Sequence, residues 1–241
     1  MGDPVTWFDL GAADEEPLKP FYAELFGWTL QPASERYTVL ATGGGINGGI
    51  GRSRSGDPWV AFYVDVADPQ ATLEAAESLG GKTAVPLTKV SDMLTFAMFT
   101  DPDGLIVGLT KAIEGEGNGG GSVGQGAPVD WFEILGSDAK RSQTFYGELF
   151  GWTYTDADPS YGLVDTGAGR GIGGGVGASG QGMRWATVYA SVEDVERYLA
   201  RAEGLGGRRE YGPLDVDDHM QSGAVRDPAG NVFGIYHHEP H

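Results

Sequence analysis

The chain has 241 residues, a formal net charge of −18 and no cysteine. The acidity argues against binding to nucleic acid or to anionic membranes, because phosphate groups attract basic proteins. The lack of cysteine excludes disulfides and thiolate ligands. The charge is compatible with a cationic ligand, although solubility alone accounts for it. No signal peptide or membrane-spanning run is visible, so we expect a cytoplasmic protein.

An internal duplication sets the organisation of the chain. The stretch Val5–Leu30 returns as Val129–Tyr154, with 12 of 26 positions identical and no gap. A period of about half the chain predicts two related domains. We expect the first domain at residues 1–111, a flexible glycine-rich linker at 112–128 and the second domain at 129–241.

The first half begins with a β-α-β-β-β pattern. Val5–Leu10 has the β-branched and aromatic residues of a strand. Asp14 is the expected N-cap of a helix, whose apolar residues recur on one face, and Gly27 is expected to end it. Three short strands are then predicted at Trp28–Leu30, Arg36–Thr42 and Ile46–Ile50.

A second β-α-β-β-β pattern completes the first half. Trp59–Val66 alternates like a strand, and Asp68 precedes a helix that reaches Leu79. Three strands are expected around Thr83–Pro86, at Met93–Thr100 and at Leu105–Thr110. The Asp-Pro-Asp-Gly run at 101–104 has strong turn chemistry. The second half repeats these features, so we predict four such modules.

This combination of motifs resembles a known superfamily. Phe-Tyr at 21–22, Leu-Phe-Gly-Trp at 25–28 and Asp-Pro-x-Gly at 101–104 all recur in the second half. The chain is similar to the vicinal oxygen chelate superfamily, which includes glyoxalase I, bleomycin-resistance proteins and extradiol dioxygenases, and most resembles its two-domain glyoxalase-like members from actinobacteria. The resemblance implies an α+β fold of tandem glyoxalase-like domains, in which four βαβββ modules form cupped half-barrels.

The resemblance also implies where a metal would bind. Enzymes of this superfamily hold a divalent cation with His, Glu or Gln, and the equivalent positions here are Phe8, Trp59 and Gly108, with Phe132, Trp185 and Gly234 in the copy. None of these side chains can coordinate a cation. We therefore expect no metal and no cofactor, which argues against glyoxalase and dioxygenase chemistry.

The same positions suit an apolar ligand pocket. Phe8 and Trp59 would bring aromatic rings to the place of the metal, and Gly108 would open room for a planar molecule, although the rings could equally fill the core. Tyr63 and Tyr189 share the strand parity of the tryptophans and should line the same cups. The predicted ligand-binding residues are Phe8, Trp59, Tyr63, Met93, Gly108, Phe132, Trp185, Tyr189, His219 and Gly234.

Two acidic residues occupy equivalent places on the opposite face of their strands. Asp9 and Glu133 each lie two residues after a tryptophan. An acid in this setting could bind the partner domain, a helix end or a cationic ligand. His219, the counterpart of Met93, could act as a general base in the second cup, because the pKa of histidine lies near neutrality.

Several functions remain open at this point. The first is a metal-independent small-molecule binding protein that sequesters an antibiotic or metabolite of aromatic or cationic character. The second is a glyoxalase-like lyase or isomerase, or a hydroxylase-like enzyme, acting on a small organic substrate. A third is a structural or signalling role with a degenerate cup. We expect a monomer or homodimer without nucleic-acid or membrane partners. The sequence does not decide whether each half closes its own barrel.

Overall fold

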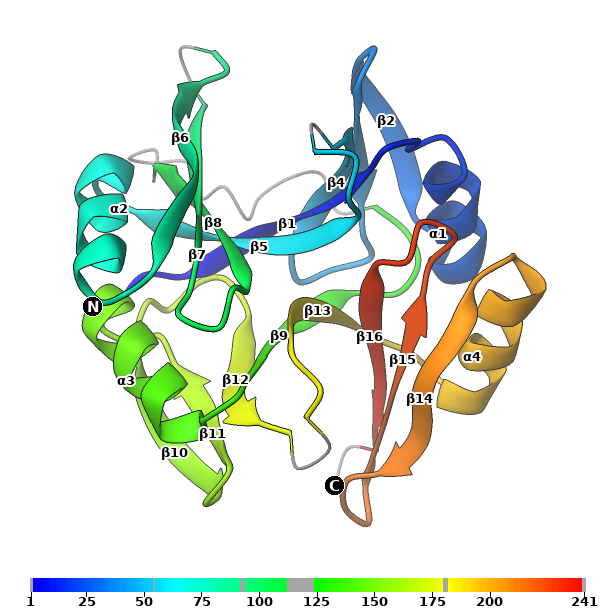
Figure 1. Cartoon of the computed structure of the whole chain (residues 1–241). Coiled ribbons are helices and arrows are strands. Elements are labelled where there is room, and N and C mark those ends of the chain that lie inside the picture. Colours follow the sequence, from blue (N-terminus) through cyan, green and yellow to red (C-terminus); the bar gives the residue numbers. More distant parts are fainter. Residues whose placement is uncertain (1, 54, 92–93, 112–123, 180–181, 240–241) are drawn as a thin grey trace. The chain divides into compact units, whose positions relative to one another are not determined.

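The computed structural model describes residues 2–53, 55–91, 94–111, 124–179 and 182–239 (Figure 1). Within these ranges, a strand, a helix and three further strands follow one another four times. The predicted four βαβββ modules are therefore confirmed. None of the helices in the described ranges has the length and apolar character needed to cross a membrane.

The four modules have closely matched elements. The first comprises β1 (Val5–Ala12), α1 (Leu18–Phe26), β2 (Thr29–Ser34), β3 (Tyr37–Ala41) and β4 (Asn47–Arg52). The second comprises β5 (Trp59–Val66), α2 (Pro69–Ser78), β6 (Lys82–Lys89), β7 (Thr95–Thr100) and β8 (Ile106–Lys111). The third comprises β9 (Val129–Gly136), α3 (Ala139–Phe150), β10 (Thr153–Asp158), β11 (Tyr161–Asp165) and β12 (Gly173–Ala178). The fourth comprises β13 (Trp185–Ser191), α4 (Val195–Gly204), β14 (Arg208–Asp215), β15 (Met220–Arg226) and β16 (Val232–His238).

The strands form two eight-stranded mixed sheets with the same order. The first sheet runs β2-β3-β4-β1-β5-β8-β7-β6, and the second runs β10-β11-β12-β9-β13-β16-β15-β14. The β5–β8 and β12–β9 pairs are parallel, whereas the outer hairpins, such as β6–β7 and β10–β11, are antiparallel. Each sheet takes its strands from one half of the chain, so the sheets follow the duplication.

The compact units of the chain do not follow the two halves. Unit 1 takes in Met1–Trp7, Ala61–Gly120 and Trp131–Ala186, and unit 2 takes in Phe8–Val60, Gly121–Asp130 and Thr187–His241. Unit 1 therefore combines most of the second and third modules, and unit 2 combines most of the first and fourth. The domain boundaries expected from the sequence remain a prediction. Most of the expected linker lies outside the described residues.

The repeated aromatic motif forms the core of each unit. In unit 2, Tyr22 of α1 stacks on Trp28, with ring centroids 5.7 Å apart and an interplanar angle of 2°. Phe233 of β16 meets the Tyr22 ring at 5.5 Å in an edge-to-face contact. In unit 1, Tyr146 of α3 likewise stacks on Trp152 at 5.9 Å. Offset-stacked and edge-to-face pairs are the preferred aromatic geometries, so the motif supplies a ready core.

A buried tyrosine–aspartate hydrogen bond joins two modules in each unit. In unit 2, the Tyr22 hydroxyl donates to Oδ2 of Asp227 over 3.1 Å. In unit 1, the Tyr146 hydroxyl donates to Oδ2 of Asp101 over 2.9 Å. Oδ1 of each aspartate accepts backbone N–H groups of its own turn, for example that of Leu105. Burial raises the pKa of both aspartates, so these hydrogen bonds offset part of the cost of burying the carboxyl groups.

The start of α1 differs from the sequence prediction. The helix begins at Leu18 with Pro17 at its N-cap, and Asp14 instead accepts the backbone N–H of Glu16. A residue that precedes a proline disfavours helical φ and ψ angles, so the helix begins later in the chain than predicted. The following Gly27, at φ 75°, ends the helix as predicted.

The carboxyl groups of Asp3 and Asp65 are neighbours in unit 1, where the N-terminal segment is hydrogen-bonded to β5. Asp65 of β5 has a fully buried side chain, pairs with Nη1 of Arg170 at 2.9 Å and accepts the Thr110 hydroxyl. Its backbone N–H donates to the carbonyl of Pro4 over 2.9 Å. Burial, and then the charge of Asp65, raise the pKa of Asp3 to about 6. An ionised Asp3 therefore weakens the attachment of the N-terminal segment to β5.

Replacing Tyr146 with Phe should lower the free energy of unfolding by about 1–3 kcal/mol, because Asp101 would lose a buried hydrogen bond. Urea unfolding monitored by circular dichroism measures the change. Tyr154→Phe is the matched control in the same unit, since the Tyr154 hydroxyl is buried and has no hydrogen-bond partner among the described residues. Its removal should be neutral or stabilising. Equal losses from both substitutions would contradict this role of Tyr146.

Asp3→Asn should stabilise the protein at pH 7–8 by on the order of 1 kcal/mol, because solvent at this half-exposed position screens part of the charge of Asp3. The folded pKa of Asp3 lies above its unfolded value. Its charge therefore costs stability above about pH 6, and this cost fades as the pH falls toward 4. Chemical denaturation of both proteins across this range tests the idea. A difference in unfolding free energy between the two proteins that does not change with pH would contradict this role of Asp3.

Candidate ligand-binding site

A half-buried acid on β9 is held between two aromatic donors in unit 1. Phe132 points into the core, where its ring lies 5.2 Å from that of Trp152, so strand alternation places Glu133 on the opposite face. Nε1 of Trp185 donates to Oε2 of Glu133 over 2.7 Å, and the Tyr161 hydroxyl donates to Oε1 over 3.1 Å. Glu133, Tyr161 and Trp185 are named the Glu133 cluster below.

The glycines of β12 allow Tyr161 to reach this acid. A Cβ atom on Gly175 would collide with the Tyr161 hydroxyl and ring, so the ring crosses bare backbone. On the other face of the same strand, a Cβ on Gly174 would collide with the Phe132 ring. The glycine-rich stretch thus lets aromatic rings from neighbouring strands pack on both faces of β12.

Unit 2 contains a related cluster around Asp9. The Tyr37 hydroxyl donates to Oδ1 of Asp9 over 2.7 Å and crosses Gly49 in the same way. The Trp59 indole lies over Gly11, since a Cβ on that glycine would collide with the indole Nε1 and Cε2. Asp9, Gly11, Tyr37 and Trp59 are named the Asp9 cluster. In both units, therefore, an acid on the face opposite the core receives a tyrosine hydroxyl.

The glycines expected at the third metal-ligand position are covered by tyrosines. A Cβ on Gly108 would collide with the Tyr63 ring, and one on Gly234 would collide with the Tyr189 ring. Each pair is directly opposed across a parallel strand pair. The expectation that Gly108 opens room for a ligand is therefore wrong, because the Tyr63 ring fills that space. Both tyrosines are only 4% exposed.

Unit 2 contains a chain of hydroxyl groups that joins the predicted Tyr189 to two residues the sequence patterns did not indicate. The hydroxyl of Tyr189 lies 3.2 Å from that of Tyr211, which lies 2.6 Å from Oγ of Ser222. Tyr211 lies on β14 beside a register shift in the β14–β15 pairing. Because such a bulge breaks the strand period, alternation along the sequence could not have assigned Tyr211 to this group.

The structure does not gather the remaining predicted residues into one site. Phe8 is fully buried and packs against Trp28 and Phe233 at 5.8 and 5.9 Å, which fits the core role left open above. Phe132 is buried in the equivalent core of unit 1. His219 is exposed in the turn between β14 and β15. Met93 lies outside the described residues. The ligand role of all these residues remains a prediction.

The residues present do not fit the divalent metal that the superfamily resemblance implies. At the three equivalent positions of the first half, Phe8 offers only carbon, Trp59 offers only an N–H donor, and Gly108 has no side chain. Glu133 is a single carboxylate whose two oxygens already accept hydrogen bonds. Across the part of the chain that the structure describes, no three His, Cys, Asp or Glu side chains are grouped to hold a metal.

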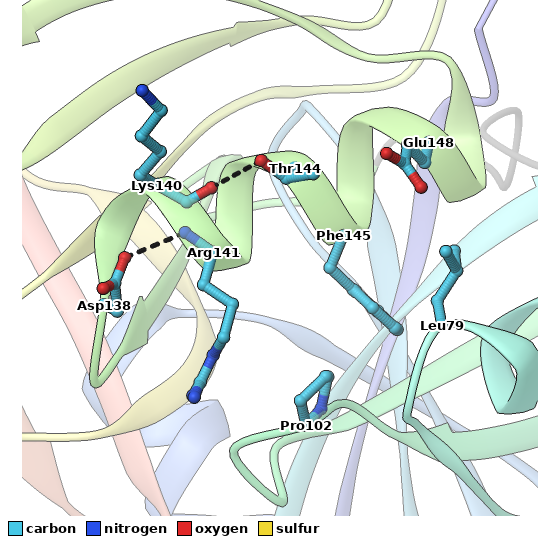
Figure 2. Close-up of a pocket in the computed structure, with 8 residues that line it drawn as sticks. All are labelled: Leu79, Pro102, Asp138, Lys140, Arg141, Thr144, Phe145 and Glu148. Carbon is cyan, nitrogen blue, oxygen red and sulfur yellow. Dashed lines mark hydrogen bonds between the residues drawn. The ribbon is translucent and has the colours of Figure 1, made fainter.

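An open groove of about 500 Å³ lies on the helix side of unit 1. Figure 2 shows Phe145 of α3 pointing toward Leu79, at the end of α2, and toward Pro102 of the β7–β8 turn. The rim of the groove also carries charged side chains, among them Arg141, whose charge is paired with that of Asp103. The groove contains none of the predicted ligand-binding residues. It is therefore a weaker candidate than the Glu133 cluster.

Comparison with known proteins finds similarity to one superfamily and to several relatives. The family model described as "Glyoxalase/Bleomycin resistance protein/Dioxygenase superfamily" matches residues 129–235. The protein named "Putative glyoxylase CFP32" of Mycobacterium tuberculosis is 26% identical over 252 residues, covering 98% of this chain and 94% of its own. "Anthracycline biosynthesis protein DauV" of Streptomyces sp. strain C5 is 26% identical over 258 residues, covering 95% and 91%.

Solved structures share the fold at low sequence identity. The Mn(II)-bound glyoxalase from Novosphingobium aromaticivorans superposes with a TM-score of 0.64 at 15% identity, covering 98% of this chain and 83% of its own. The 2,3-dioxygenase LapB from Pseudomonas sp. KL28 gives 0.65 at 15% identity, covering 100% and 94%. Likeness at this level of identity shows the fold and leaves the chemistry to the residues of the site.

Purified protein dialysed against manganese and then against metal-free buffer should retain far less than one ion per chain. The reason is that the expected ligand positions offer no carboxylate, imidazole or carbonyl side chain. Elemental analysis by mass spectrometry measures the bound ion. One tightly held manganese, nickel or zinc per unit would contradict this assignment of the site.

Proposed function

We propose that this chain, which belongs to the Glyoxalase/Bleomycin resistance protein/Dioxygenase superfamily, binds a small planar organic cation without the help of a divalent metal. The Glu133 cluster carries the proposal. It combines a partly exposed carboxylate with an indole and a phenol whose polar atoms bond that carboxylate. An anionic group beside aromatic rings recognises a cation through ion pairing and cation–π attraction together.

The charge of the whole chain supports a cationic ligand. A net charge of −18 creates a negative potential that raises the local concentration of cations and their rate of association. The names of the relatives support a small organic molecule as the ligand class, since one is named as a glyoxylase and another for anthracycline biosynthesis. Neither name identifies the ligand of this chain.

An enzymatic role is the second candidate, and the hydroxyl chain of unit 2 favours it. Tyr189, Tyr211 and Ser222 form a run of hydrogen-bonded hydroxyls, and such a run can pass a proton between a bound molecule and solvent. A lyase, isomerase or hydroxylase-like reaction would use this ability. The two candidates differ in one respect: a binding protein releases its ligand unchanged, whereas an enzyme alters it.

N-methylacridinium and acridine at pH 8 form a matched pair of planar probes, one cationic and one neutral. The cation should bind at least about tenfold more tightly, equivalent to about 1.4 kcal/mol, because only the cation pairs with a carboxylate. Titration calorimetry measures both affinities, and EDTA should leave them unchanged.

Glu133→Gln should remove most of the preference for the cation, since the amide keeps the size of the side chain but not its charge. Glu148→Gln, on the exposed surface of α3, is the matched control and should retain the preference. Equal affinities for the two probes in the unsubstituted protein, the absence of binding, or loss of binding in EDTA would each contradict the proposal.

A further inference from the structure

The two acid–aromatic clusters are related by the duplication but are not equivalent. Resting on the function proposed above, we infer that the ligand is held at the Glu133 cluster of unit 1, and that Leu135 is the positioning residue that keeps Trp185 on Glu133. The Asp9 cluster of unit 2 then serves a packing role. Three differences between the clusters support this assignment.

The first difference is the residue beside the tryptophan. Gly11 and Leu135 occupy the same place in the duplicated stretch, two positions after Asp9 and Glu133 respectively. In the first half, the Trp59 indole lies directly over Gly11, where no Cβ atom could be accommodated. In the second half, the buried side chain of Leu135 stands at that place. An indole therefore cannot lie there.

The second difference is where the tryptophan goes as a result. Trp185 is the counterpart of Trp59, and its Nε1 donates to Glu133 over 2.7 Å. Its exposed fraction is only 8%, whereas Trp59 is half-buried. Leu135 thus prevents the Trp185 indole from lying over β9 in the way that Trp59 lies over Gly11. The carboxylate of Glu133 is left as the hydrogen-bond acceptor for the indole.

The third difference is the length of the acid. Glu133 has one methylene more than Asp9, and its two oxygens accept from two different side chains, Trp185 and Tyr161. Trp185 thus bonds the acid of its cluster, whereas Trp59 lies over Gly11. A carboxylate held by two donors loses little further freedom when a ligand binds, and such preorganisation increases affinity. The longer side chain of Glu133 therefore prepares its carboxylate for a ligand.

The position of Trp185 can be tested without any ligand. The indole N–H resonances of Trp59 and Trp185, assigned with Trp→Phe variants, report on their hydrogen bonds. Leu135→Ala should shift the Trp185 resonance by allowing its ring to move toward β9, and Glu133→Asp should shift it by shortening the acceptor. The Trp59 resonance should stay in place in both variants. A Trp185 resonance that stays in place in Leu135→Ala would overturn the role of Leu135.

Binding of N-methylacridinium separates the two clusters. It should shift the Trp185 resonance and leave that of Trp59 in place, and Glu133→Asp should weaken binding at least about tenfold at an unchanged melting temperature. Asp9→Asn is the matched variant in the other cluster and should leave the affinity within about twofold. A Trp59 response equal to that of Trp185, or an equal loss from Asp9→Asn, would overturn the assignment while keeping the proposed function.

The two failures are distinguishable. Absence of N-methylacridinium binding in the unsubstituted protein overturns the proposed function and, with it, the assignment of the ligand to the Glu133 cluster. The ligand-free resonances still decide the role of Leu135 in that case. If Leu135→Ala loses its fold, which its melting temperature reveals, the milder Leu135→Val supplies the decisive spectrum.

Discussion

The hydrogen bond between a buried tyrosine and a buried aspartate is the constraint on which each compact unit depends. Asp227 is 4% exposed and Asp101 is equally buried, so each carboxyl group loses its water and needs protein donors in its place. Tyr22 and Tyr146 provide them from α1 and α3. The Phe-Tyr motif of the helices and the Asp-Pro-x-Gly motif of the turns, which are far apart in the sequence, thus meet in one contact. Loss of the Tyr146 hydroxyl would take that donor from Oδ2 of Asp101, whereas Oδ2 of Asp227 would keep the hydrogen bond from Asn231 if Tyr22 were replaced.

This contact also explains why the sheets and the cores group the modules differently. The strands of one half pair with each other, but the helix of the first module finds its aspartate in the fourth, and the helix of the third module finds its aspartate in the second. Trp28 and Trp152 add hydrogen bonds within the same units by donating to the carbonyls of Ala127 and Asp3, which precede β9 and β1. One half alone would therefore leave much of its aromatic core uncovered.

Local signals in the sequence were sufficient to predict some elements and not others. The strand Trp59–Val66 has the predicted bounds, and Asp68 caps the next helix as expected, because alternation and capping are local effects. The start of α1 was predicted too early, since proline delays the helix and Glu15 turns inward to pair with Arg52, 37 residues away. The room expected at Gly108 is filled by Tyr63, because cross-strand register decides that contact.

The pairing of tyrosine rings with glycines narrows the chemistry available to this chain. Tyr37 over Gly49, Tyr63 over Gly108, Tyr161 over Gly175 and Tyr189 over Gly234 all follow the same pattern, in which a ring covers backbone that has no side chain of its own. At Gly108 and Gly234, the ring fills the place where the superfamily resemblance puts a coordinating side chain. The polar groups left beside the rings are single carboxylates and hydroxyls, and these suit recognition of a charged organic molecule or proton transfer better than metal coordination.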